Sequence, residues 1–431
     1  MKSNGFERTT GLKKYLIPLV LFLFFFIIYF CSVDIHSKNF RVWNFLFDAD
    51  SPRVIRVFTA PHFTSDIHRH PLYALFFKFP TRVINSFIGD PGRSALLVTS
   101  AGGALAVVLS YLIFCNLPLG KKDSLLFAMI FGFTSSFWLL SSIPETYSLN
   151  VLMIVTGFYL QTVPVVKGKG ILFVVLGFII YSVIATGITL SNFVYATFAF
   201  INFLRKQIKK FSHGFFILLF YFVSVTLLLV KFSFVQKLLY NSYCFYSWSS
   251  LIKVFQSNSL YFFWNQMRTP AGVSAILLTF FSYNIIAPKV SLIFFYDFLR
   301  PWNILGFVGT GGLLYWIANL FFLFLIIFSL TAGLRKKLFF DKDWQLALSF
   351  ILFNLIFHFF YRAVGIPFIF AVHVTFSIIF LIASAYQNSG AGFKRIVLII
   401  FLLLLFGNNF NFISSVNHHL RYDQPNFQSR R

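Results

Sequence analysis

The sequence predicts an all-α integral membrane protein with about eleven transmembrane helices and a long first external loop carrying interfacial helices. Three observations support this fold class. Hydrophobic residues make up 58% of the 431-residue chain and charged residues only 11%. Apolar runs of about 20 residues, long enough to cross a hydrocarbon core as a helix, recur along the whole chain. Basic residues cluster between these runs, as the positive-inside rule requires.

The predicted spans follow one another as apolar runs bounded by polar residues. They cover residues 15–33, 95–116, 124–142, 146–166, 170–187, 188–204, 214–234, 304–330, 344–361, 366–386 and 396–413. All short basic clusters agree with one threading, in which the N-terminus is cytoplasmic and the C-terminal tail external. The whole chain, 1–431, is therefore expected to form a single transmembrane domain.

Two long segments fall on the external side in this threading. The first, residues 34–94, is rich in charge and histidine and is the expected location of an active site. The second, residues 235–303, is rich in aromatic residues. It contains an apolar stretch, residues 273–287, which is too short to span comfortably and is expected to lie in the interface or to re-enter.

The composition also argues against other classes of protein. The net charge of +24 does not indicate a nucleic-acid partner, because the basic residues lie between hydrophobic spans. Membrane lipids are the expected neighbours instead. The three cysteines, Cys31, Cys115 and Cys244, are far apart and share no spacing typical of a metal site.

The first external segment opens with an unusual pair of carboxylates. Residues 47–53 read FDADSPR, and the chain has only 12 acidic residues against 36 basic ones. Charge held beside a bilayer is costly and points to function. Asp50 or Ser51 is expected to cap a helix with Pro52 at its first position. The alternative is that Asp50 is only a cap and the nearby arginines only meet lipid headgroups.

Basic residues follow in the same segment. Arg53, Arg56 and Arg69 offer guanidinium forks suited to phosphate oxygens. His70, fixed by the proline after it, is a further candidate contact for phosphate or sugar. His68-x-His70 could instead bind a metal, although the spacing is weak support. Residues 72–87 are predicted to form an amphipathic piece on the membrane that is broken at Pro80.

Glu145 lies in SIPETY, residues 142–147, between the third and fourth predicted spans. We expect it to line the same external cavity as Asp50; alternatively it is a plain N-terminal helix charge. Arg362 is also external in this threading. His373 lies about two turns into its span and is expected to face the bundle interior, because an imidazole facing lipid is costly.

This arrangement resembles the GT-C superfamily of polytopic glycosyltransferases, which includes protein O-mannosyltransferases and the lipid A aminoarabinose transferase. The matching features are Asp48 and Asp50 after the first span, Arg53, the turn at residues 70–72, and Glu145 before the fourth span. The turn carries a histidine where the family has lysine. The resemblance implies a hexosyl- or pentosyltransferase with a polyprenyl-phosphate sugar donor and inversion at the anomeric carbon. A bacterial inner membrane with an outward-facing active site is the expected location.

The resemblance also implies roles for the candidate residues. Asp50 would be the general base, with Asp48 as the alternative. Glu145 would orient the acceptor, or would hold a divalent cation such as Mg or Mn together with an aspartate. A second set would bind the substrate and neutralise the departing lipid phosphate. That set comprises Arg53, Arg56, Arg69, His70 and Arg362.

Other functions stay open. A transporter or flippase would also be polytopic, but would more often place broken helices at mid-bilayer. A lipid-glycan ligase or polymerase would use a late external loop, such as residues 235–303. A membrane acyltransferase would use an intramembrane histidine, such as His358 or His373. The residues do not specify the sugar, the acceptor or the oligomeric state.

Overall fold

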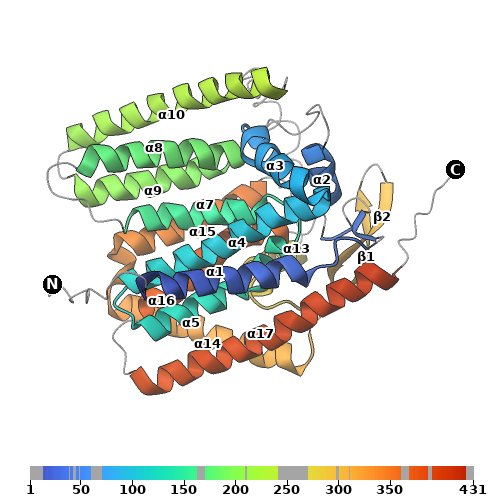
Figure 1. Ribbon diagram of the computed structural model, residues 1–431. Helices are drawn as coiled ribbons and strands as arrows, with labels where there is room; N and C mark the ends of the chain where they lie inside the picture. Colours follow the sequence, from blue (N-terminus) through green and yellow to red (C-terminus); the bar gives the residue numbers. More distant parts are fainter. Residues whose placement is uncertain are drawn as a thin grey trace.

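The computed structural model describes residues 13–37, 39–41, 45–47, 49–59, 70–162, 170–208, 211–240, 270–297, 300–309, 311–360, 368–386 and 391–423. These residues form an α-helical bundle whose long helices lie side by side with roughly aligned axes (Figure 1). The arrangement agrees with the predicted class, an all-α protein with membrane-spanning helices.

The longest helices are α1 (Lys13–Ser32), α4 (Pro91–Asn116), α8 (Gly170–Ile188), α10 (Phe211–Tyr240), α14 (Leu313–Arg335), α15 (Lys342–Phe360), α16 (Phe368–Ala385) and α17 (Ala391–Tyr422). The shorter helices are α2 (Ser51–Thr59), α3 (Phe79–Ile88), α5 (Lys121–Gly132), α6 (Ser135–Ser141), α7 (Tyr147–Leu160), α9 (Asn192–Gln207) and α13 (Pro270–Leu278). Single turns and strands complete the fold: η1 (Asn39–Arg41), η2 (Ala74–Lys78), η3 (Thr279–Tyr283), η4 (Leu338–Phe340), β1 (Val290–Asp297) and β2 (Arg300–Phe307).

Seven helices in the described part of the chain are long and apolar enough to cross a membrane. The number is eight if the bent pair of α5 and α6 counts as one span. The predicted count of eleven is therefore not confirmed. Helices α7 and α9, with 14 and 16 residues, fall short of the roughly 20 residues that a span needs.

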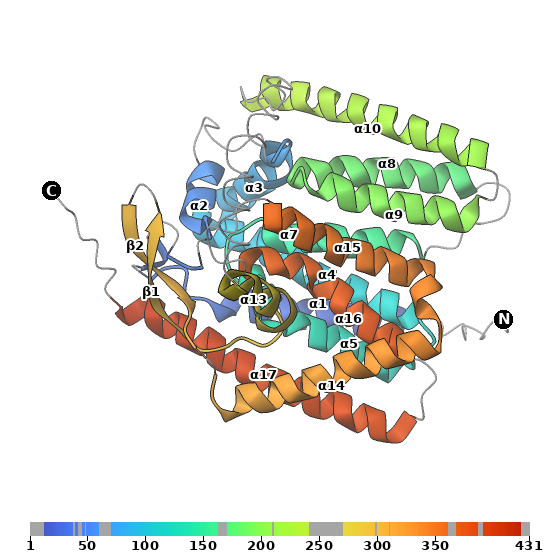
Figure 2. The ribbon, with the colours of Figure 1, turned by 180° about the vertical axis from the view of Figure 1, so that it is seen from behind.

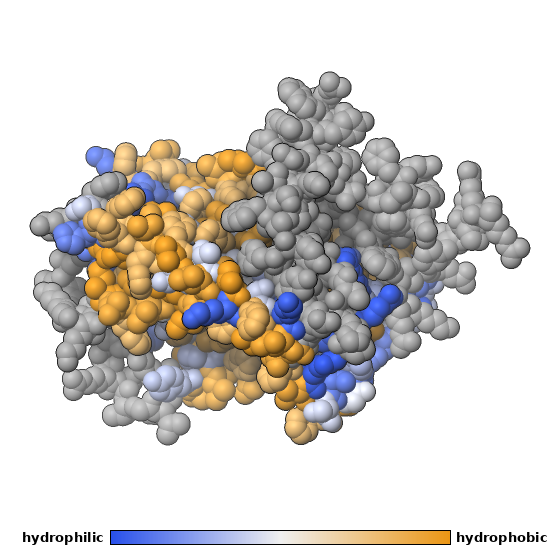
Figure 3. Space-filling model, turned by 90° about the horizontal axis from the view of Figure 1, so that it is seen from above, coloured by the Kyte–Doolittle hydropathy of each residue, from blue (hydrophilic) through white to orange (hydrophobic). Residues whose placement is uncertain are grey.

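The bundle has central and peripheral helices. In α16, 89% of the span is buried inside the protein, and in α4 the share is 67%. In α1 and α10 the share is only 17%. Figure 3 looks onto the α10 side and shows a broad apolar surface there. An apolar surface on helices of this length is what contact with lipid requires.

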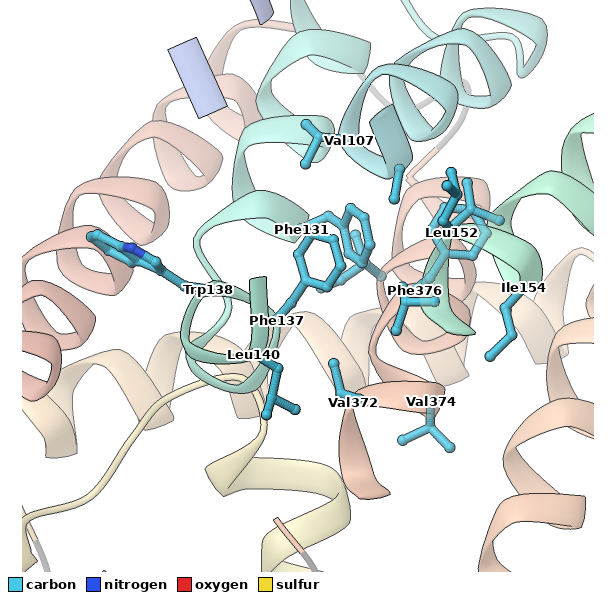
Figure 4. Close-up of a cluster of buried hydrophobic side chains, with 14 of the residues drawn as sticks. Val107, Phe131, Phe137, Trp138, Leu140, Leu152, Ile154, Val372, Val374 and Phe376 are labelled. Carbon is cyan, nitrogen blue, oxygen red and sulfur yellow. The ribbon is translucent and has the colours of Figure 1, made fainter. Parts of the chain in front are cut away.

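Aromatic side chains fill the centre (Figure 4). The rings of Phe131 and Phe137 stack with centroids 4.4 Å apart, and Phe376 of α16 meets Phe131 edge-on at 5.5 Å. Gly103 lets α4 approach α6 closely, because a Cβ there would lie 2.4 Å from Oγ of Ser141. The core is therefore built from packed aromatic rings, and the absence of a side chain at Gly103 allows α4 and α6 to come close together.

One span is broken inside the bundle. Helices α5 and α6 meet at an angle of 68°, although the sequence predicted one span over residues 124–142. The backbone N–H groups of Ser135 and Ser136 donate to the carbonyls of Ile285 and Asn284, at 3.0 and 3.1 Å. Asn409 Nδ2 donates to the carbonyls of Phe133 and Ile285, at 2.8 and 2.7 Å. The break persists because these remote partners satisfy backbone groups that lipid could not.

The second predicted external segment contains a β-hairpin that the sequence reading did not foresee. Strands β1 and β2 pair antiparallel, with Val290 opposite Phe307. The span predicted over residues 304–330 consequently starts later, at Leu313. Before the hairpin, α13 and η3 together run over residues 270–283, which is shorter than a span. The prediction that residues 273–287 do not cross the membrane stays a prediction.

The first external segment is helical beyond residue 72, but the predicted break at Pro80 is wrong. The π-helical turn η2 runs directly into α3, and Pro80 lies in the first turn of α3. A proline is accommodated there because its fixed φ is helical and it lies where the π-helical pairing of η2 changes to the α-helical pairing of α3. Helix α3 ends at Gly89, which adopts a left-handed φ of 72°, and the Asp90 side chain caps α4.

Candidate functional site

Helices α2 and α3 and the β-hairpin gather at one end of the bundle (Figures 1 and 2). We call this end the site end, and the opposite end, where α5 and α17 begin, the basic end. The loop between α6 and α7 also reaches the site end. Segments that the sequence threading placed on the external face therefore lie together.

The hairpin anchors the chain that leads to Asp50. The backbone of Phe47 donates to the carbonyl of Leu305 at 3.2 Å, and Leu305 donates to Phe45 at 2.7 Å. The buried ring of Phe47 packs against Phe307 and Phe368, with centroids 5.0 Å apart in each case. The chain therefore enters α2 from a fixed position.

Helix α2 begins as the sequence predicted, directly after Asp50. The carbonyl of Asp50 accepts from the N–H of Val54 at 2.9 Å. One turn along the helix, Nη1 of Arg53 lies 3.6 Å from Oδ2 of Asp50. A cation thus lies beside the carboxylate favoured as general base. The hydroxyl of Ser51 is buried and has no hydrogen-bond partner among the described residues, so its side chain does not cap the helix.

Glu145 is buried at the site end, with only 3% of its surface exposed. Its Oε2 accepts from the N–H of Thr146 at 3.2 Å, whereas Oε1 has no hydrogen-bond partner within the described ranges. Burial, followed by the negative charge of Asp50, raises the pKa of Glu145 to about 8. The N–H groups of Thr146 and Asp50 and the charge of Arg53 act in the opposite direction. The structure therefore brings Asp50, Arg53 and Glu145 into one cluster, which we call the carboxylate cluster.

The raised pKa of Glu145 decides what this carboxyl group can do at neutral pH. With a pKa of about 8, Glu145 is mostly protonated and can donate a hydrogen bond. Asp50 acts on it as a negative charge and has Arg53 as its counter-ion. Neighbouring titratable groups with different proton affinities are a common basis for acid–base chemistry.

Two more basic side chains lie on α2 and on η2, the turn that packs against α2. Helix α2 packs against η2 and α3, and carries Arg56 on an exposed position. Lys78 of η2 is completely buried. Its burial, and then the charge of Arg82, lowers the pKa of Lys78. Lys78 is one of the basic residues of the first predicted external segment, but its burial was not predicted from the sequence.

His70 is held by the turn between α8 and α9. Its Nδ1 lies 2.7 Å from the carbonyl oxygen of Ile188, and 3.3 Å from Oγ1 of Thr189. A carbonyl only accepts hydrogen bonds, so Nδ1 carries the proton and Nε2 is the acceptor in the neutral ring. Thr189 and Asn192 both donate to Oδ1 of Asn150, at 2.8 and 3.0 Å. The ring orientation is thus set by a buried polar network.

The oxygen atoms of the carboxylate cluster also suit a divalent cation. Mg²⁺ and Mn²⁺ prefer carboxylate oxygens, and Asp50 and Glu145 supply these. The buried and unpartnered Oε1 of Glu145 is an atom that such an ion, or a substrate hydroxyl, would satisfy. Three predicted site residues, Asp48, Arg69 and Arg362, lie outside the described residues, as does His68.

Two buried histidines lie below the carboxylate cluster. The rings of His358 and His373 have centroids 6.4 Å apart, and Tyr147 contacts His373 at 5.9 Å. Nδ1 of His358 and Nε2 of His373 have no hydrogen-bond partner in the described part of the chain. Tyr147 follows Glu145 by two residues, so the histidine pair adjoins the carboxylate cluster.

Comparison with known proteins does not assign this site. No family model matches the chain, and no curated protein matches it either. The function therefore has to be inferred from the geometry of the carboxylate cluster.

Proposed function

We propose that this protein is a membrane glycosyltransferase that moves a sugar from a polyprenyl-phosphate donor to an acceptor at the external membrane face, with inversion. The observation that supports this proposal best is the carboxylate cluster, in which Asp50, Arg53 and Glu145 meet at one end of an apolar bundle. A base for the acceptor hydroxyl and a cation for the departing phosphate are the groups that such a transfer uses.

Asp50 is the proposed base. It takes the proton of the acceptor hydroxyl while that oxygen attacks the anomeric carbon. The bond between this carbon and the donor phosphate breaks, and its electrons leave with the polyprenyl phosphate. One base suffices, because the phosphate departs as a stable anion and needs no proton. Asp48 is the alternative base.

Positive charge stabilises the departing phosphate. Arg53 and Arg56 project from α2, and Lys78 lies on η2, which packs against α2. Fixed cations are most effective where charge develops in the transition state, because they need no reorganisation. His70 is included as a further donor-binding residue, with Arg69 and Arg362 as predicted members of the same set.

Protonated Glu145 orients a hydroxyl of the acceptor or sugar by donating a hydrogen bond. If the enzyme uses a divalent cation, Asp50 and Glu145 would hold it through their carboxylate oxygens. The cation would then add positive charge near the donor phosphate. Bacterial inner membrane is the proposed location.

The test is a transfer assay with the purified protein in lipid vesicles. Polyprenyl-phosphate hexoses and pentoses are supplied as donors, with and without Mg²⁺ or Mn²⁺, and products are identified by mass spectrometry. Envelope glycans and lipid-linked sugars are compared in cells with and without the protein, to find the acceptor. Transfer that depends on Asp50 supports the proposal. Unchanged glycans together with no turnover of any donor would contradict it.

The histidine pair favours one second candidate, membrane acyl transfer. A buried imidazole nitrogen without a partner can serve as a base for an acceptor hydroxyl. His373→Ala and Asp50→Asn separate the two functions. Loss of lipid-linked acyl transfer in His373→Ala, with Asp50→Asn active, would favour acyl transfer over glycosyl transfer.

A further inference from the structure

A second cluster of metal-ligating side chains lies at the end of α17, away from the carboxylate cluster. His418, His419 and Asp423 each offer one ligand atom, and these atoms all lie within 4.8 Å of one another. Nδ1 of His419 is already 2.7 Å from Oδ2 of Asp423. The three ligand atoms are therefore within the range at which one ion could bind them together.

Hydrogen bonds to the segment after α1 hold the backbone that carries these ligands. Asn39 Nδ2 donates to the carbonyls of His419 and Asp423, at 3.0 and 2.5 Å. Arg421, between the ligands, donates to Oδ2 of Asp34 at 3.0 Å. These contacts cross-link the helix end to the segment after α1, so the ligands do not depend on a free helix terminus.

We propose that His418, His419 and Asp423 form a binding site for a zinc-class divalent transition metal. Two imidazoles and one carboxylate match the ligands of Zn²⁺ and Co²⁺, whereas Mg²⁺ and Ca²⁺ prefer sites made of oxygen alone. Three protein ligands leave one position for water. A bound ion replaces the direct contact between His419 and Asp423 by two metal bonds.

The site has a structural consequence that does not depend on the proposed transferase activity. Asn39 belongs to η1, which precedes the residues that the β-hairpin anchors ahead of Asp50. A metal at the end of α17 would strengthen the attachment of that segment. We expect the ion to stabilise the site end of the fold.

The experiment uses the full-length protein in detergent, stripped with a chelator. Co²⁺ is added first, because a tetrahedral Co²⁺ site gives intense visible absorption bands, and the thermal midpoint is then followed with Zn²⁺ and with Mg²⁺. The variants are Asp423→Asn, His419→Ala and His418→Ala. The matched control is His213→Ala, which changes an exposed histidine at the start of α10.

We expect Co²⁺ bands and a Zn²⁺-dependent rise in midpoint for the wild type and for His213→Ala. Each ligand variant should weaken the affinity by at least about tenfold, since even changes in outer-shell partners have effects of this size. His418 is exposed, so its variant should fold even if His419→Ala does not. The proposal would be overturned if Co²⁺ gave no absorption bands or if the ligand variants bound the metal as tightly as the wild type. An equal rise in thermal midpoint with Mg²⁺ would also overturn it.

Discussion

Two buried carboxyl groups at opposite ends of the bundle differ in their hydrogen-bond partners. Asp123, at the basic end, is 8% exposed, and both of its oxygens accept from Arg395, at 2.6 and 3.2 Å. Glu145, at the site end, is 3% exposed and has one oxygen without a hydrogen-bond partner in the described residues. Its nearest charged neighbours include Asp50, a like charge.

The difference separates a structural group from a candidate functional one. The guanidinium group of Arg395 donates to both oxygens of Asp123, and this ion pair joins α17 to α5. We interpret it as a structural contact. A buried carboxyl group beside a like charge is costly, and groups of this kind concentrate at functional sites. If this difference is real, substitutions of the two carboxyl groups should have unlike effects on turnover and on stability.

The largest effect is expected from Asp50→Asn. The amide keeps the shape of the side chain but cannot accept the acceptor's proton, so turnover should fall by about 10²–10⁴-fold. The measurement is the initial rate of transfer from a polyprenyl-phosphate sugar, at matched amounts of folded protein. Asp123→Asn is the matched control and should retain turnover. If Asp48→Asn abolishes the rate while Asp50→Asn retains it, the base is Asp48.

Glu145→Gln should change how stability depends on pH. The ordinary pKa of 4.5 applies to the unfolded chain, and the folded value is about 8. The folded state therefore favours the protonated form, and this stabilisation is present below pH 4.5 and lost as pH rises through about 8. One pKa unit corresponds to about 1.4 kcal/mol, so the full loss amounts to a few kcal/mol.

Thermal midpoints of wild type and Glu145→Gln should therefore diverge between pH 5 and pH 9, in favour of the variant at high pH. Glutamine cannot ionise, so it has no such loss. A difference in midpoint that stays constant across this range would show that Glu145 does not carry a raised pKa.

Asp123→Asn should lower stability without changing chemistry. It leaves Arg395 without its fork partner, but the Arg395 side chain is 35% exposed and water can take part of that role. A fall of a few degrees in thermal midpoint is expected. The double variant with Arg395→Gln should recover part of it, because removing both partners costs less than removing one. A larger fall in turnover than in stability would contradict the structural role.

Cysteine substitutions on the surface should change stability least. They test directly which end of the bundle faces the outside of the cell. Ser86 on α3 and Lys122 on α5 are both exposed, and lie at the site end and the basic end. In a background without native cysteines, Ser86→Cys should react with an impermeant reagent from outside. Lys122→Cys should react only after permeabilisation. The reverse pattern would place the carboxylate cluster in the cytoplasm and remove the external acceptor.

Apolar runs in the sequence located the helices well, but did not show how they bend or which of them span. The bend between α5 and α6 depends on a hydrogen bond to the carbonyl oxygen of Ile285 and on one from the amide of Asn409, and no local pattern over residues 124–142 contains these partners. The apolar residues 304–307 suit a strand as well as a helix, and pairing with β1 decided the outcome.

The scarcity of acidic residues was enough to select Asp50 and Glu145 as candidates, and their proximity emerges only from packing. Some side chains that act from other elements were not foreseen. Asn409 is an example, a buried polar residue in an apolar helical run. Such residues are signals in themselves, because an unpartnered polar group inside a membrane is rarely retained. Which partner each one finds depends on the tertiary fold.

The contacts of Asn409 also constrain how the protein is made. Helix α17 is synthesised after the other described helices, yet its Asn409 supplies the hydrogen bonds for the carbonyl groups of Phe133 and Ile285, which are made much earlier. Until that asparagine arrives, these carbonyls must be satisfied by water, lipid headgroups or the insertion machinery. A chain stopped before residue 409 therefore lacks the amide that satisfies the carbonyl groups of Phe133 and Ile285 at the break between α5 and α6.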